Sequence, residues 1–312
     1  MSKKNQTKVN LGNLRRLSGG VSGHSGIIQA MLEIEKLEPI DYLVIGHLTV
    51  DHTPQGARLG GTASYASLTA KALGMRVGIV SSWGMEIPAG ALQNIPLVNF
   101  PTDMSTTFEN VYTPHGRVQY LRNNAPRLDY YQVPEKWRSA NIVHLGPVAQ
   151  EVEPGLVRNF PQSFIGVTPQ GWMRAWQGDG RVYPTEWPEA SFVLERANAA
   201  VISIEDVGGD ESRIDELAAS CKVLAVTEAA EGARLFWNGD VRRFRPPTIN
   251  EVDPTGSGDI FAAAFFTRLF TTRDPWEAAR FATALTAFSV TRPGLEAIPT
   301  PEEINACKVE VF

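Results

Sequence analysis

The sequence contains two cysteines, Cys221 and Cys307, among its 312 residues. Two thiols are too few for a disulfide framework, and no spacing of Cys and His typical of a four-ligand zinc site occurs. No apolar stretch approaches the roughly 20 residues that a membrane-spanning helix requires. Residues 11–26, with their repeated Gly and Ser, also interrupt the apolar core that a secretory signal would need. These absences predict a cytoplasmic protein that has no part in a membrane.

The sequence also has fewer basic residues than acidic ones. The chain carries 29 Lys and Arg against 34 Asp and Glu, a formal net charge of −5, and no basic stripe offsets this balance locally. Nucleic-acid binding is therefore disfavoured. No Gly-x-Gly-x-x-Gly follows the first expected strand, which argues against a dinucleotide-dependent oxidoreductase. The hydrophobic share of 43% predicts a folded protein with a sizeable core, in one large α/β domain or two smaller ones.

A change of pattern near residue 39 divides the chain. The first part of residues 1–38 is rich in Gly, Ser, Asn and Lys. Residues 27–38 have an apolar spacing that is typical of a short amphipathic helix. Two interpretations of this N-terminal extension stay open: it packs on the main domain or on a partner subunit, or it forms a partly disordered tail. We expect residues 39–312 to form the main domain.

Short apolar runs separated by polar or helical stretches predict a parallel sheet covered on both faces in the main domain. Residues 41–51 indicate a buried strand that ends at Asp51, and Gly60-Gly61 indicates a tight turn into a small-residue helix. Ligands of such sheets bind at the carboxyl ends of the strands. The residues that follow the expected strands are Asp51, Gly60, Gly61, Pro147, Thr168, Gln170, Asp206 and Thr227.

Residues 105–128 have a different pattern. Apolar residues alternate with polar ones, among them Phe108, Val111, Val118 and Tyr120, and they flank a Thr-Pro-His-Gly turn. This combination is a hairpin signal and predicts a β flap beside the sheet.

Residues 253–265 (DPTGSGDIFAAAF) combine a glycine-rich turn with the start of an apolar helix. The amides of Gly256, Ser257 and Gly258 then fall at the helix N-terminus, where unpaired donors and the helix dipole attract an anion. Alone, Asp259 would be an ordinary stabilising acid in a first helical turn. Beside an anion site, it has the position of a base that takes the proton of a hydroxyl receiving a phosphoryl group.

Two motifs resemble the signatures of the PfkB, or ribokinase-like, carbohydrate kinases. Residues 253–265 are similar to that family's C-terminal Asp-Thr-x-Gly-Ala-Gly-Asp motif, and residues 59–74 (LGGTASYASLTAKALG) are similar to its N-terminal Gly-Gly motif. The motifs stand in the family's order, and the resemblance covers about residues 39–301. It implies a three-layer α/β/α fold with a mostly parallel central sheet and a small β lid, at about residues 52–58 and 106–121.

The resemblance also implies an ATP-dependent transfer of a phosphoryl group to a hydroxyl of a small polyol or sugar. It makes Asp259 the catalytic base and assigns the anion hole to the amides of Gly256, Ser257 and Gly258. The residues that match the family's substrate-binding positions are Asp51, Gly60 and Gly61.

Further matches concern the nucleotide and a cation. Residues 223–239 resemble the family's nucleotide turn, Thr-x-Gly-x-x-Gly-Ala: Thr227 and Gly232 match, but Ala229 replaces the first glycine. Thr283 and Ala287 would face the adenine, with a plain core helix as the alternative. Some members hold a monovalent cation such as K⁺ where this chain has Asp253, Thr255 and the carbonyls near Ser289, Arg292 and Gly294.

Two departures from the family pattern bear on substrate and metal. Tyr65 stands where many sugar kinases of the family have an Asn that contacts the sugar. The inositol kinase branch has an aromatic residue there, which favours a cyclitol such as myo-inositol. The family's magnesium motif Asn-x-x-Glu aligns with Ser203 and Asp206, and Glu205 is the candidate to compensate. Mg²⁺ is expected because the charge of a nucleoside triphosphate needs bridging.

The altered nucleotide and metal motifs leave an alternative function, a non-catalytic sensor of nucleotide or polyol, or a partner subunit of the same fold. The intact Asp259 and its glycines favour the enzyme, because a binder needs no base. The short β lid would also suit a homodimer through the lid, although an edge covered within one monomer is equally consistent.

Overall fold

The computed structural model describes residues 37–54, 56–86, 89–113 and 116–308, with Pro39–Phe312 as its main compact unit. The predicted extension and its helix lie almost wholly outside the described residues, as does the Pro114-His115 tip of the predicted hairpin. Within the described part, no helix is long and apolar enough to cross a membrane.

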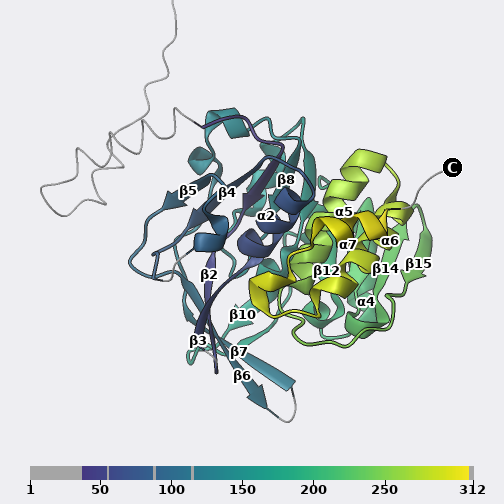
Figure 1. Ribbon diagram of the computed structural model, residues 1–312. Helices are drawn as coiled ribbons and strands as arrows, with labels where there is room; N and C mark the ends of the chain where they lie inside the picture. The colour runs from purple at the N-terminus through teal and green to yellow at the C-terminus, as the bar shows by residue number, and fades with distance from the viewer. Residues whose placement is uncertain (1–36, 55, 87–88, 114–115, 309–312) are drawn as a thin grey trace, which may run out of the picture. The chain divides into compact units, whose positions relative to one another are not determined.

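A nine-stranded sheet forms the centre of the main unit (Figure 1). Two strands at one edge of this sheet, β14 and β15, run antiparallel to their neighbours, and its other strands all run parallel to one another. Short apolar runs build it, as the sequence predicts. In spatial order the strands are β15 (Asp240–Phe244), β14 (Ala233–Trp237), β13 (Val223–Thr227), β12 (Ala199–Ser203), β9 (Phe164–Val167), β8 (Ile142–Leu145), β1 (Tyr42–Ile45), β4 (Val77–Ser82) and β5 (Leu97–Phe100).

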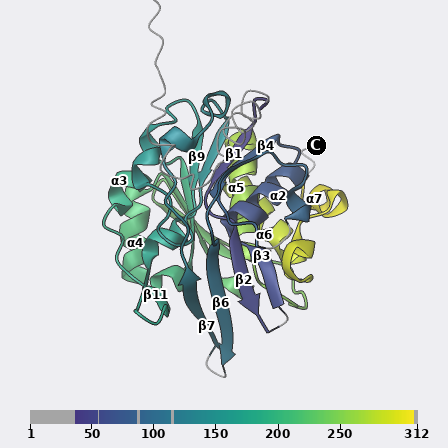
Figure 2. The ribbon, with the colours of Figure 1, turned by 90° about the vertical axis from the view of Figure 1, so that its left-hand side faces the viewer.

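Helices cover both faces of this sheet, which confirms the three-layer α/β/α prediction (Figure 2). One face carries α2 (Thr62–Ala72), α5 (Ser257–Thr272), α6 (Pro275–Ser289) and α7 (Pro301–Cys307), and the other carries α3 (Ala190–Leu194) and α4 (Glu211–Ser220). Helix α5 packs on β8 and β12, and its Phe261, Ala263 and Ala264 are at most 2% exposed. Burial of this apolar face fixes the N-terminus of α5 at the carboxyl ends of the strands.

A second, four-stranded sheet forms the lid, in the order β3, β2, β6, β7 (Figure 2). The strands are β2 (Thr49–Thr53), β3 (Gly56–Gly60), β6 (Thr106–Thr113) and β7 (Gly116–Asn123). The small hairpin of β10 (Arg174–Trp176) and β11 (Val182–Pro184) lies next to β7, where the Leu121 amide donates to the Gly180 carbonyl at 2.8 Å. The lid is therefore somewhat longer than the ranges predicted from the sequence.

The prediction of one buried strand over residues 41–51 is wrong. Strand β1 ends at Ile45, and β2 belongs to the lid sheet, so the chain changes sheets between them. At the crossing, a Cβ on Gly46 would overlap the Gly146 carbonyl oxygen, and the Leu48 amide donates to Ser81 Oγ at 2.9 Å instead of to a sheet partner. Asp51 consequently lies in the lid and not at the end of a central strand.

Candidate active site

Helix α5 begins directly after Gly256, whose backbone is left-handed, with φ 78° and ψ −2°. A Cβ here would overlap the ring of Tyr65, so the turn needs glycine for its conformation and for space. The Ser257 amide donates to the Pro254 carbonyl at 3.1 Å and so closes the turn. At Gly258 an added Cβ would meet no atom within 4 Å, which leaves that side of the loop open to a ligand.

Asp259 lies in the first turn of α5 and contacts the other motif of the chain. Thr62 Oγ1, at the start of α2, donates to Asp259 Oδ1 at 2.7 Å. Thr62 is 3% exposed, and its methyl group packs so closely on Gly146 that a Cβ there would lie 2.5 Å from Thr62 Cγ2. This packing directs the Thr62 hydroxyl at the carboxylate, so two motifs that are distant in sequence share one hydrogen bond.

The electrostatic surroundings of Asp259 favour a proton acceptor. Asp259 is partly buried, and the loss of water around its carboxylate raises its pKa to about 6. The hydrogen bond from Thr62 and the charge of Arg174 oppose the rise, whereas the charges of Asp206 and Asp51 add to it. Asp259 is therefore ionised at pH 7 but binds a proton more readily than an exposed aspartate does.

Asp51 and the Gly60-Gly61 pair meet at the junction of lid and helix. Thr49 Oγ1 donates to Asp51 Oδ1 at 2.9 Å, and a Cβ on Gly60 would overlap the Asp51 carboxylate. Gly61, the N-cap of α2, has φ 83°, and a Cβ on it would lie 2.5 Å from the His47 carbonyl oxygen. Both glycines thus permit the lid strand to lie directly against the start of α2.

Tyr65 lies beneath the glycine loop, and its ring is not exposed to a bound sugar or cyclitol. It is 2% exposed and packs with Ile260 and Ala297. Burial raises the pKa of its hydroxyl, and the charges of Asp51, Asp259 and Asp253 raise it further. The ring is therefore positioned to support the left-handed turn at Gly256 from below.

The predicted nucleotide turn follows β13. The Thr227 hydroxyl donates to the Ile202 carbonyl at 3.3 Å, and the Glu228 amide closes the turn on the Gly232 carbonyl at 2.7 Å. Gly232 has φ 94°, and a Cβ on it would overlap the Phe244 carbonyl oxygen. Ala229 has φ 48°, the left-handed conformation typical of glycine, so the turn keeps its shape despite the replaced residue.

The two residues predicted to face the adenine, Thr283 and Ala287, are 5% and 4% exposed on α6. Among the described residues, Thr283 Oγ1 has no hydrogen-bond partner. In this structure both residues therefore have the core position that the sequence left as the alternative.

Asp206 and Glu205 differ in their surroundings. Asp206 accepts the Ser203 amide at 2.8 Å and Gln170 Nε2 at 3.0 Å; burial raises its pKa, and the charge of Arg174 opposes this rise. Glu205 is exposed. Across the described ranges, no group of three or more His, Cys, Asp or Glu side chains could hold a metal ion. The two carboxylates fit a hold on Mg²⁺ through water better than direct coordination.

Asp253 joins the two segments predicted to surround a monovalent cation. Its carboxylate accepts the amides of Thr255 at 2.9 Å and Gly294 at 3.2 Å. Burial works against its charge, but these hydrogen bonds and the charge of Arg58 keep the pKa of Asp253 below its usual value. The carboxylate thus ties the glycine loop to the segment that contains Gly294.

Three residues of this region were missed by sequence reasoning: Thr62, Arg58 and Arg174. Thr62 and Arg58 stand on either side of the Gly60-Gly61 pair, and this position beside the motif could have predicted that they belong to the site. Arg174 follows the 3₁₀ turn η6 (Pro169–Met173), whose Gln170 bonds Asp206, and its charge acts on both Asp259 and Asp206. No local pattern marks it, because its neighbours come from other strands.

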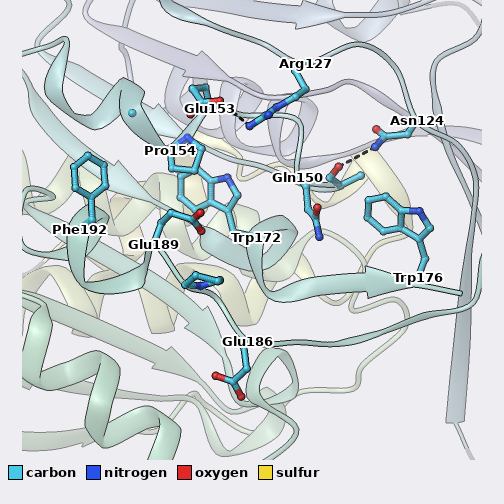
Figure 3. A pocket seen from close by; sticks show the side chains of 13 residues that line it. Asn124, Arg127, Gln150, Glu153, Pro154, Trp172, Trp176, Glu186, Glu189 and Phe192 are labelled. Carbon is cyan, nitrogen blue, oxygen red and sulfur yellow. Dashed lines mark hydrogen bonds and ion pairs between the residues drawn. The ribbon is translucent and has the colours of Figure 1, made fainter.

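A cavity of about 750 Å³ opens beside the β10 hairpin (Figure 3). Its wall includes Trp172, Trp176 and Glu189, together with the ion pair between Arg127 and Glu153 at 2.6 Å. None of the site residues predicted from the sequence lines it. The cavity is therefore distinct from the cluster around Asp259.

Similarity to known proteins agrees with this geometry. Residues 188–303 match the family model described as pfkB family carbohydrate kinase. This part of the chain is therefore similar to the PfkB carbohydrate kinases. Among curated relatives, a cytidine kinase of Thermococcus kodakarensis is 27% identical over 72% of this chain and 87% of its own length. An inositol 3-kinase of Zea mays is 26% identical over 82% of this chain and 66% of its own length.

Solved structures show the same fold. A pyrophosphate-dependent kinase of the ribokinase family, complexed with a pyrophosphate analog and myo-inositol, has a TM-score of 0.72 at 18% identity and covers 86% of this chain and 100% of its own. Arabidopsis thaliana ribokinase, complexed with ribose and ATP, has a TM-score of 0.65 at 16% identity, over 87% and 99% of the two chains. The predicted ribokinase-like fold is confirmed, and the similarity to the carbohydrate kinase model and to relatives named as kinases supports a phosphotransferase.

Proposed function

We propose that this chain transfers the γ-phosphoryl group of ATP to a hydroxyl of a small cyclitol such as myo-inositol, with Asp259 as the base. The observation that carries the proposal is the Asp259 carboxylate, partly buried at the start of α5, bonded to Thr62 and with a pKa of about 6. A base works best when its pKa lies near the working pH. The inositol 3-kinases of Zea mays and Oryza sativa among the relatives, and the myo-inositol complex among the similar structures, support the acceptor class.

The chemistry uses groups from both ends of the domain. Asp259 accepts the hydroxyl proton while the acceptor oxygen bonds to the γ-phosphorus and the bond to the leaving ADP breaks. Thr62 holds Oδ1 of the carboxylate, which leaves Oδ2 for this proton. The amides of Gly256 and Gly258, at the N-terminus of the 16-residue α5, stabilise charge on the transferring group, whereas the Ser257 amide serves the turn.

Two further sets of residues hold the reactants in this proposal. Asp51 and the Gly60-Gly61 pair bind acceptor hydroxyls, and Tyr65 supports them from beneath. The nucleotide lies along a surface contributed by Thr227 and Gly232, and Thr283 and Ala287 pack in the core of α6 behind that surface.

Metal ions have supporting places in this proposal. Mg²⁺, when bound, would neutralise and bridge the donor phosphates, with Glu205 and Asp206 ordering its water ligands. Asp253, Thr255 and the segment that contains Gly294 form the candidate surroundings of a K⁺ ion. Asp206 and Asp253 keep their protein hydrogen bonds in these roles.

A matrix of donors and acceptors tests the proposal. ATP and pyrophosphate are each combined with myo-inositol, fructose, ribose and cytidine, and phosphorylated product is measured by ³¹P NMR. Pyrophosphate and cytidine are included because one similar structure is named a pyrophosphate-dependent kinase and one relative is named a cytidine kinase. We expect the highest kcat/KM for ATP with myo-inositol. A higher value for another pair would refute the stated donor or acceptor, and tight binding without any product would favour the sensor.

The base assignment is tested by Asp259→Asn. We expect a loss of kcat of about 10²–10⁴-fold, as is typical on removal of a general base. Asp274→Asn is the matched control, because Asp274 is an acid at the start of the neighbouring helix α6, where it accepts the Trp276 amide at 2.9 Å. Asparagine caps helices as well as aspartate does, so this control should retain activity. Equal activity in the two variants would show that Asp259 is only a helix-terminal acid.

A further inference from the structure

Arg58 extends from the lid to the loop that precedes α5. It lies in β3 directly opposite Asp51 of β2, so both side chains lie on the same face of the lid sheet. Arg58 Nη1 is 3.6 Å from Oδ2 of Asp253, the first residue of the glycine loop. A lid strand thus places a guanidinium between the proposed acceptor-binding carboxylate and the proposed phosphate-binding turn.

The contact between Arg58 and Asp253 is loose. The two groups are 3.6 Å apart, and the side chain of Arg58 is 40% exposed. Exposed ion pairs of this kind contribute little to stability. Asp253 in addition accepts two backbone amides, from Thr255 and Gly294, so its carboxylate remains hydrogen-bonded if the arginine leaves. Arg58 can therefore exchange Asp253 for another anion at small cost.

The centre of the site carries an excess of negative charge. Asp51, Asp259 and Asp253 all act electrostatically on the buried Tyr65, and Arg58 is the cation that acts on the same group. A transferring phosphoryl group adds further negative charge among these carboxylates. Arginine suits such a group because its planar fork donates two parallel hydrogen bonds to phosphate oxygens.

We propose that Arg58 is a catalytic residue of the lid, whose guanidinium leaves Asp253 and binds the transferring phosphoryl group when the donor is in place. This inference rests on the proposed kinase function. Arg58 keeps its protons throughout: the acceptor oxygen bonds to the γ-phosphorus, the bond to ADP breaks, and the acceptor proton goes to Asp259. The guanidinium neutralises charge on the phosphoryl oxygens as that exchange occurs.

The test compares the full-length wild-type chain with Arg58→Ala, Arg58→Lys and a matched control, Arg122→Ala. Arg122 is also a lid arginine, in β7, paired with Glu109 at 2.6 Å and 44% exposed. We expect Arg58→Ala to lower kcat by about 10²–10³-fold, as does removal of one donor to a developing oxyanion. Arg58→Lys should recover part of the rate, and Arg122→Ala should stay within about twofold of wild type because exposed ion pairs contribute little.

Binding gives a second measurement that a merely structural arginine would not change. Dissociation constants for ADP and for a non-hydrolysable ATP analogue are measured by calorimetry with each variant. Arg58→Ala should weaken the analogue by about tenfold or more, the size of a lost charge-assisted hydrogen bond, and leave ADP unchanged. Equal losses for both nucleotides, or a kcat equal to that of Arg122→Ala, would overturn the role of Arg58. A wild-type chain that phosphorylates no acceptor would overturn the proposed function alone, because the ratio of the two affinities would still decide on Arg58.

Discussion

Replacement of Thr62 by valine should move the acidic limb of the pH–rate profile without abolishing catalysis. The Thr62 hydroxyl donates to Asp259 Oδ1 at 2.7 Å and is one of the interactions that hold the pKa of Asp259 down to about 6. Valine keeps the branched shape that packs on Gly146 but lacks the donor. The variant therefore isolates the hydrogen bond from the packing.

The size of the shift follows from the strength of the lost hydrogen bond. A hydrogen bond to a charged group stabilises it by roughly 1.5–3 kcal/mol, and one pKa unit corresponds to about 1.36 kcal/mol. The pKa of Asp259 should then rise by roughly 1–2 units, to between about 7 and 8. At pH 7, about half or less of the variant would hold the base in its ionised form, whereas at pH 9 nearly all of it would.

The assay is kcat/KM for the preferred acceptor across pH 5–9, because this parameter reports pKa values of the free enzyme. Thr62→Ser is the control, since it keeps the hydroxyl and loses the methyl contact with Gly146, and its acidic limb should stay near that of wild type. If Thr62→Val lowered the rate equally at every pH and left the limb in place, Thr62 would not set the basicity of Asp259. If the limb itself were unaffected by Asp259→Asn, the limb would belong to another group.

Two further predictions concern the nucleotide turn and the lid. Ala229→Gly should raise the free energy of unfolding by about 0.5–1 kcal/mol. The left-handed backbone of alanine costs roughly 1–2 kcal/mol, and glycine removes this cost but loses more conformational entropy on folding. Thermal denaturation measures the change, with Ala230→Gly as a control that should be less stable than wild type. A homodimer through the lid would pair the outer edge of β3, which has no strand partner in the described part of the chain. Light scattering on the purified chain would refute that arrangement by showing a monomer at all concentrations.

The sequence predicts the parts of the site that depend on neighbouring residues. The glycines of 256–258 must precede an apolar helix that is buried, and this alone places Asp259 in a first helical turn at the carboxyl ends of the strands. The Gly60-Gly61 turn into α2 is equally local, since the left-handed φ of Gly61 is a property of one residue. Family resemblance then combines two local signals into one site.

Contacts between distant segments decide what the sequence does not predict. Residues 41–51 are mostly apolar, and this pattern does not reveal that the first strand ends at Ile45 and that the chain continues in the lid sheet. The position of Tyr65 under Gly256 is another such contact. Arg58 and Arg174 belong to the same class, because a charge gains its role from the carboxylates that other strands bring beside it.

The raised pKa of Asp259 has a consequence for stability as well as for catalysis. A group whose pKa is higher in the folded state than in the unfolded state, here about 6 against 3.8, stabilises the fold fully below the lower value and loses that contribution as pH rises through the higher one. The difference of about 2 units corresponds to roughly 3 kcal/mol at pH 8. Asp259→Asn, expected to be nearly inactive, should therefore be more stable than wild type at pH 8 by up to about 3 kcal/mol, and no more stable at pH 3.5. Urea denaturation at the two pH values measures this difference. A variant that is less stable than wild type at pH 8 would show that the ionised Asp259 carboxylate does not destabilise the fold.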